Sequence, residues 1–139
     1  MKFTEAFAFL GYRLENHQNE WSSESDTGVC ITLWKSELSR ENSLPAYELD
    51  LSDDEMGPNH WTTKSGHKKR TRHLTKAEEQ FGGAVDVVLL DGPPGGPYEG
   101  ASPWEKSKRG YGWKVAFLNR ETGEFRVEID LDTKFPTET

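Results

Sequence analysis

The clearest constraint on the fold is a period-two pattern near the end of the chain. Apolar residues take every second position on either side of a turn at 120–123: Trp113, Val115, Phe117, Phe125, Val127, Ile129 and Leu131. Because side chains alternate between the two faces of a strand, this pattern predicts an antiparallel hairpin. One face of the hairpin is expected to be apolar and to lie on a core, and the other to be charged.

Other segments also have the composition of strands. Residues 29–34 alternate, with aliphatic side chains on one face and a cysteine, a threonine and a tryptophan on the other. A turn at 26–28 predicts a partner strand at 21–25, and a short edge strand is expected at 47–51. The unbroken apolar run at 84–90 is typical of a strand that is buried on both faces.

Two short helices are predicted. Thr4 can cap a helix over residues 4–11, which Gly11 would end. Thr75 begins a capping-box sequence, which predicts a second helix ending near Gly82.

Long loops are expected in two places. Residues 52–74 have no apolar periodicity, and residues 91–112 hold four of the seven prolines and six of the 13 glycines. The whole pattern predicts an α+β fold: a small mixed, strongly curved sheet of about five or six strands, or an open barrel, with two short helices. We expect one globular domain over residues 1–132 and a C-terminal tail over 133–139.

Composition narrows the class of protein. Only 33% of the 139 residues are hydrophobic, but 16 aromatic residues can fill a small core. Cys30 is the only cysteine, which excludes an internal disulfide and favours a reducing compartment. The N-terminal apolar residues are interrupted by Glu5, Gly11 and Arg13, so neither a signal peptide nor a membrane span is expected. These features predict a cytoplasmic protein with no membrane partner.

Positive charge is concentrated in one segment of an acidic chain. The net charge is −7, yet no Asp or Glu lies between Glu55 and Glu78. Six of the 17 basic residues lie there: Lys64, Lys68, Lys69, Arg70, Arg72 and Lys76. Such a segment predicts a local site for an anion, most commonly the phosphates of a nucleic acid, and His67 and His73 would add charge in mild acid. The alternative is a solvated loop whose charges face acidic surface.

Tryptophans adjoin basic residues in two places. Trp61 borders the basic segment, and Trp104 precedes Lys108 and Arg109. A ring beside a cation is what base stacking with phosphate contact requires. The alternative for each ring is that it packs a loop onto the core, as we expect for Trp113.

Catalytic and metal-binding patterns are weak. Asp86 lies near the start of the apolar run and Asp91 directly follows it. Asp132 and Lys134, just after Asp130, have the acid-x-Lys spacing of one nuclease class. These residues keep a metal-dependent nuclease as an alternative. No His or Cys spacing matches a zinc site, and no cofactor is expected.

Two segments carry a resemblance. ENHQNEWSSESDTGVCITLWKSEL and NRETGEFRVEI resemble a loose group of small uncharacterised bacterial and phage proteins. Their shared pattern is an N-terminal helix, a Trp-Ser strand, an apolar strand ending in Leu-Trp and a C-terminal hairpin. The resemblance implies a place near restriction or other defence genes, which favours DNA recognition. It covers 3–38 and 112–131 and implies no catalytic residues.

The sequence therefore favours a non-catalytic nucleic-acid-binding module, with DNA preferred over RNA. Lys68, Lys69, Arg70 and Arg72 would neutralise phosphates, while a loop tryptophan stacks on an exposed or flipped base. This hypothesis requires the basic segment and the loop at 98–112 to share one edge of the sheet. The alternative from another class is a protein-interaction factor, an inhibitor or accessory subunit, that acts through its acidic surface.

Overall fold

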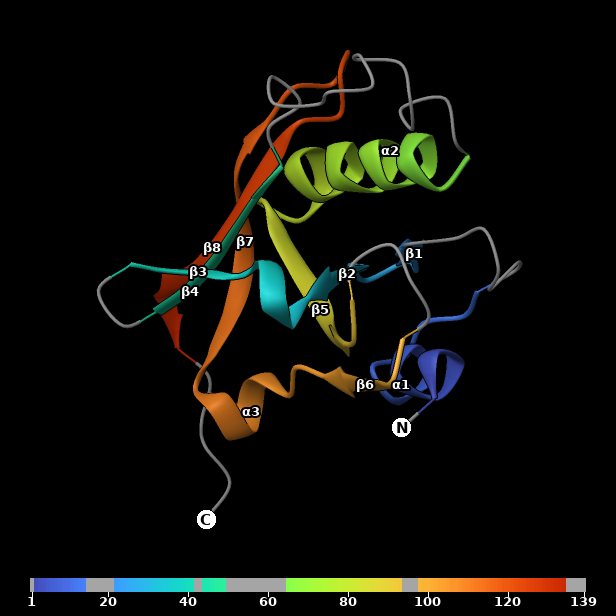
Figure 1. The fold of residues 1–139 in the computed structure, drawn as a ribbon. Helices are drawn as coiled ribbons and strands as arrows, with labels where there is room; N and C mark the ends of the chain where they lie inside the picture. The colour runs from blue at the N-terminus through green and yellow to red at the C-terminus, as the bar shows by residue number, and fades with distance from the viewer. Residues whose placement is uncertain (1, 15–21, 42–43, 50–64, 94–97, 135–139) are drawn as a thin grey trace.

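A computed structural model describes residues 2–14, 22–41, 44–49, 65–93 and 98–134 (Figure 1). The elements in chain order are α1 (Phe3–Phe9), β1 (Ser22–Glu24), β2 (Val29–Trp34), η1 (Lys35–Glu37), β3 (Ser39–Glu41), β4 (Leu44–Leu49), α2 (Ser65–Gln80), β5 (Ala84–Asp91), β6 (Gly100–Pro103), α3 (Lys106–Arg109), β7 (Tyr111–Leu118) and β8 (Phe125–Lys134). The predicted α+β class is confirmed. The described residues form eight strands, more than the sequence indicated, and three α-helices.

The strands form one mixed sheet in the order β1-β2-β5-β7-β8-β4-β3, with β6 beside β5. β2 and β5 are parallel and the other pairs are antiparallel. The end strands do not pair with each other among the described residues, so the sheet is open and not a closed barrel. One edge of β5 is shared: its start pairs with β7 and its second half with β6.

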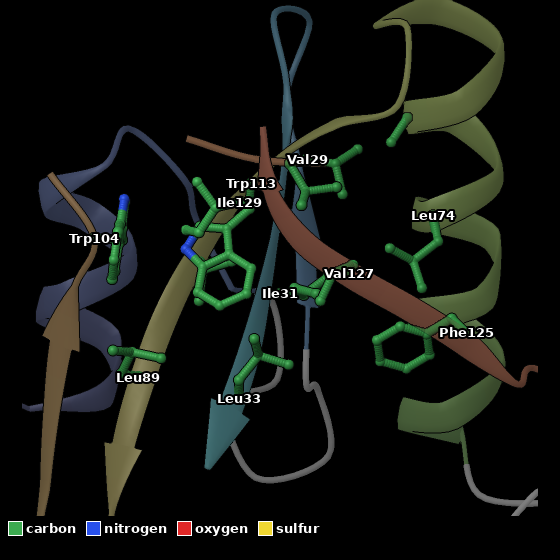
Figure 2. Close-up of a cluster of buried hydrophobic side chains, with 13 residues drawn as sticks. Val29, Ile31, Leu33, Leu74, Leu89, Trp104, Trp113, Phe125, Val127 and Ile129 are labelled. Atoms are coloured by element: carbon green, nitrogen blue, oxygen red, sulfur yellow. The ribbon is translucent and has the colours of Figure 1, made fainter. Parts of the chain in front are cut away.

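The sheet is covered on both faces at its centre. α2 contacts β1, β2, β5 and β7 on one face, and α1 contacts β6 on the other. The larger core lies under α2 and contains Leu74 of that helix, the odd-numbered residues of β2, and Trp113 and Phe125 of the hairpin (Figure 2). A second cluster joins Phe7 of α1 to Cys30 and to even-numbered residues of β5. Burial on both faces explains the unbroken apolar run of β5.

The C-terminal hairpin is confirmed, with two differences on its apolar face. Trp113, Phe125 and Val127 are buried as predicted. Phe117, however, is 53% exposed, because a register shift between Val115 and Phe117 places it opposite Arg126. A bulge adds one residue to one strand and so reverses the face of the residues that follow. Leu131, also predicted to be apolar-facing, is 54% exposed.

Several sequence-based boundaries were wrong. α1 begins at Phe3, one residue before the predicted cap Thr4. β4 begins at Leu44 and has β3 outside it, so it is not an edge strand. The expected loop at 91–112 contains β6 and α3, and β8 continues two residues into the predicted tail. None of the described helices has the length and apolar composition that a membrane-spanning helix needs.

Candidate nucleic-acid interface

The basic segment is helical, which corrects the predicted loop. α2 runs from Ser65 to Gln80, beginning ten residues before the expected start at Thr75. Among its described side chains, from Lys68 onward, the buried ones are Arg70, His73, Leu74 and Ala77, which recur at the spacing of one helical face. Two of these four residues, Arg70 and His73, are ionisable. The sequence therefore lacks the apolar helical periodicity that would have predicted this amphipathic helix. The helix ends near Gly82 as predicted: its last residue is Gln80, and Gly82 and Gly83, which follow closely, both have positive φ.

Arg70 is part of the core and not of the outer surface. Only 8% of it is exposed, and its guanidinium carbon lies 4.9 Å from the centroid of the Phe125 ring. Burial lowers the pKa of Arg70 to about 10, while the charges of Tyr47 and Glu37 act in the opposite direction. The group therefore stays protonated at neutral pH. As placed, Arg70 stabilises the contact between α2 and β8 and does not face solvent with the other predicted phosphate-binding residues.

His73 and Lys76 are also held by the fold. The Nδ1 atom of His73 lies 2.6 Å from Oγ of Ser22 on β1, and both residues are buried. The Lys76 ammonium donates to the Ser25 carbonyl oxygen at 3.0 Å and lies 3.4 Å from a Glu24 carboxylate oxygen. These contacts attach α2 to the β1–β2 hairpin. Because of these contacts, fewer cations of the basic segment are exposed to solvent than the sequence predicted.

Lys68 and Arg72 are the exposed cations of α2. They are four residues apart, so they lie one turn apart on the same face of the helix. Neither forms an ion pair with any residue that the structure describes. Lys69, beside them, is half-buried. Two predicted site residues, Lys64 and Trp61, lie outside the described residues.

The second predicted basic group lies elsewhere. α3 carries Lys108 and Arg109 and lies at the opposite end of the molecule from α2 (Figure 1). Lys108 pairs with Glu105 at 3.4 Å, and Arg109 lies 4.5 Å from the centroid of the Trp104 ring. The two basic groups therefore do not form the single surface that the sequence-based hypothesis required.

Trp104 is buried and is not an exposed loop ring. Its indole packs edge-to-face on Trp113, with ring centroids 5.4 Å apart, and its Nε1 donates to the Tyr111 carbonyl oxygen at 2.7 Å. Its backbone N–H donates to Val87 where β6 and β7 separate along β5. In Figure 2 the indole nitrogen of Trp113 lies on the side of its ring nearest Trp104. The ring closes the end of the core, as the alternative interpretation had it.

Asp86 belongs to a network that the sequence analysis missed. The Tyr12 hydroxyl donates to one carboxylate oxygen at 2.6 Å, and the Lys106 ammonium lies 3.1 Å from the other. Burial first, and then the hydrogen bond to Asp86, raise the pKa of Tyr12. The network joins the end of α1 and the start of α3 to β5. A polar residue inside an apolar strand was its only sequence signal.

The two aspartates of the nuclease alternative are separated by the sheet. Asp86 lies on the α1 side of β5, whereas Asp91 is at the end of the strand and pairs with Lys35 at 3.1 Å. No group of three or more His, Cys, Asp or Glu side chains that could hold a metal ion occurs among the described residues. The side chains of Asp132 and Lys134 lie outside them.

Comparisons with protein-family models, curated proteins and solved structures gave no match to this chain. The resemblance to small bacterial and phage proteins therefore stays a prediction.

Proposed function

We propose that the protein is a non-catalytic nucleic-acid-binding module that contacts phosphates through the outer face of α2. The observation that carries the proposal is the exposed pair Lys68 and Arg72, which lack an acidic partner among the described residues of a chain with net charge −7. Like charges at this spacing destabilise a helix by about 0.2–0.5 kcal/mol. A bound polyanion would remove this repulsion and release counterions.

The pairing of several other cations supports the proposal. Among the described residues, Lys35 pairs with Asp91, Lys106 with Asp86, and Lys108 with Glu105. An acidic protein repels nucleic acid over most of its surface, so attraction is expected only where exposed cations lie together without acids, as Lys68 and Arg72 do within the described part of the chain. Binding is therefore expected to be local and weak, with a dissociation constant on the order of 10⁻⁴ to 10⁻⁶ M at moderate salt.

Fluorescence anisotropy with short single- and double-stranded DNA and RNA tests the proposal. The variant Lys68→Glu/Arg72→Glu should lose at least about tenfold in affinity at low salt, because two attractive contacts become repulsive. The matched control is Arg13→Glu/Arg40→Glu, which changes the net charge equally at two exposed residues outside α2. Equal binding by the parent and the α2 variant, with both folded, would refute the proposal.

A protein-interaction factor is the second candidate. The aromatic side chains of Phe9 and Tyr98 are exposed, and the ring of Phe3, the first residue of α1, lies 5.8 Å from the Tyr98 ring between centroids. Exposed aromatic groups are enriched at protein interfaces. No retention on DNA or RNA at low salt, together with a stable complex with a protein, would favour this candidate over the first.

A further inference from the structure

On the basis of the proposed function, we infer that the surface on α2 accepts a single nucleic-acid strand that crosses the helix, and disfavours a duplex. The cationic surface is short. Lys68 and Arg72 are separated by four residues, which corresponds to about 6 Å along a helix with a 1.5 Å rise per residue. It therefore offers contacts to one or two neighbouring phosphates.

The next part of the same helical face is acidic. Glu79 follows Arg72 by seven residues, so it lies two turns further along the same side of α2, about 10 Å away. Its carboxylate and that of Glu78 share one guanidinium, that of Arg120, at 2.8 and 3.4 Å. These two acids and one base leave a net negative charge at the C-terminal end of the face.

The turn between these two regions supplies no free positive charge. Lys76, one turn after Arg72, is directed to Glu24 and to the Ser25 carbonyl oxygen. Asp26 is exposed in the adjacent β1–β2 turn. The basic surface is therefore bounded by carboxylates on the β1–β2 side and along the helix axis. Along the axis, Glu79 lies about one Debye length away, which is about 10 Å at 0.1 M salt.

This arrangement of charges favours a single strand over a duplex. A helix that lies in a duplex groove about 12 Å wide runs beside two rigid phosphate backbones over several turns. On α2 that placement brings phosphates beside Glu78 and Glu79. A flexible single strand can cross at Lys68 and Arg72 and turn away from the acids. The carboxylates thus act as a selectivity element against the duplex.

Anisotropy with a 5′-labelled DNA strand of about 12 nucleotides, and with the same strand in a duplex, tests the inference at low salt. The parent protein should bind the single strand about fivefold more tightly. Glu78→Gln/Glu79→Gln should raise duplex affinity about fivefold and single-strand affinity less than about twofold, because the repulsion it removes acts mainly on the duplex. Glu5→Gln/Glu99→Gln makes the same charge change at exposed residues outside α2 and is the matched control.

The possible results distinguish failure of this inference from failure of the proposed function. Equal or tighter binding of the duplex by the parent, or an unchanged ratio in Glu78→Gln/Glu79→Gln, overturns the inference while nucleic-acid binding stands. Absence of binding to either form at the lowest salt overturns both. A preference for the single strand that disappears in Glu78→Gln/Glu79→Gln but persists in the control supports the inference.

Discussion

Two arginines of α2, two residues apart, should respond in opposite ways to the same substitution. Arg70 is buried over Phe125, whereas Arg72 is exposed. Replacing Arg70 by Ala removes a buried apolar stem, at about 0.8 kcal/mol per methylene, and a cation–π contact worth about 0.5–2 kcal/mol. We therefore expect Arg70→Ala to lower the free energy of unfolding by about 2–4 kcal/mol. Arg72→Ala should change it by less than about 0.5 kcal/mol.

Urea unfolding followed by tryptophan fluorescence and circular dichroism measures the difference, because Trp113 lies in the core beside the affected helix. A melting temperature should fall by about 3–5 °C per kcal/mol for a chain of this size. Arg70→Met keeps most of the stem and should lose less than Arg70→Ala. Measured below its transition, Arg70→Ala should keep the parent's salt dependence of nucleic-acid binding, while Arg72→Ala should weaken binding.

The placement of α2 would be refuted by the reverse pattern. If Arg70→Ala were as stable as the parent and Arg72→Ala were the unstable variant, the helix would be rotated about its axis relative to the sheet. The buried face would then not contain Arg70, and the assignment of Lys68 and Arg72 to the outer surface would fail with it.

Two further predictions concern the core beneath α1. Burial raises the pKa of both Cys30 and Tyr12, so the folded protein keeps protons that the unfolded chain releases. Stability should therefore fall as the pH rises above the unfolded-state pKa of each group, about 8.5 for Cys30 and about 10 for Tyr12, by up to about 1.4 kcal/mol per pH unit for each. Urea midpoints between pH 7 and 10 should decline less steeply in Cys30→Ala, and an unchanged decline would contradict the assignment. Gly28→Ala should cost about 1–3 kcal/mol, because its added Cβ would meet the Tyr12 hydroxyl and displace it from Asp86. The loss should shrink in a Tyr12→Phe background, and strictly additive losses would show that the two residues do not interact.

The strands were the most predictable part of the fold. The faces of β2 and the hairpin of β7 and β8 follow from local alternation, and the burial of β5 follows from its apolar run; the structure confirms all three. The bulge before Phe117 was not predictable. The apolar and polar residues still alternate in the sequence there, and the bulge changes only how the two strands pair. β6 was not recognisable among prolines and glycines, since its pairing depends on residues of β5 that are 9 to 15 positions away in the sequence.

The start of α2 was missed for a different physical reason. A helix is recognised by apolar residues at helical spacing, but two of its inward positions are Arg70 and His73. Each is compensated by a partner that is distant in sequence, Phe125 for the arginine and Ser22 for the histidine. Such compensation exists only after the chain has folded, so no local pattern could reveal it.

The burial of Arg70 also changes how many phosphate contacts the basic segment is expected to make. Four phosphate contacts, from Lys68, Lys69, Arg70 and Arg72, would give a slope of log affinity against log salt of about −3 for a single strand. With Arg70 in the core and Lys69 half-buried, only Lys68 and Arg72 are fully presented, and the expected slope falls to about −1.5. The slope of log affinity against log salt therefore measures how many cations of the folded protein contact phosphates. A value near −3 would mean that Lys69 and a residue outside the described part, such as Lys64, also contact the strand.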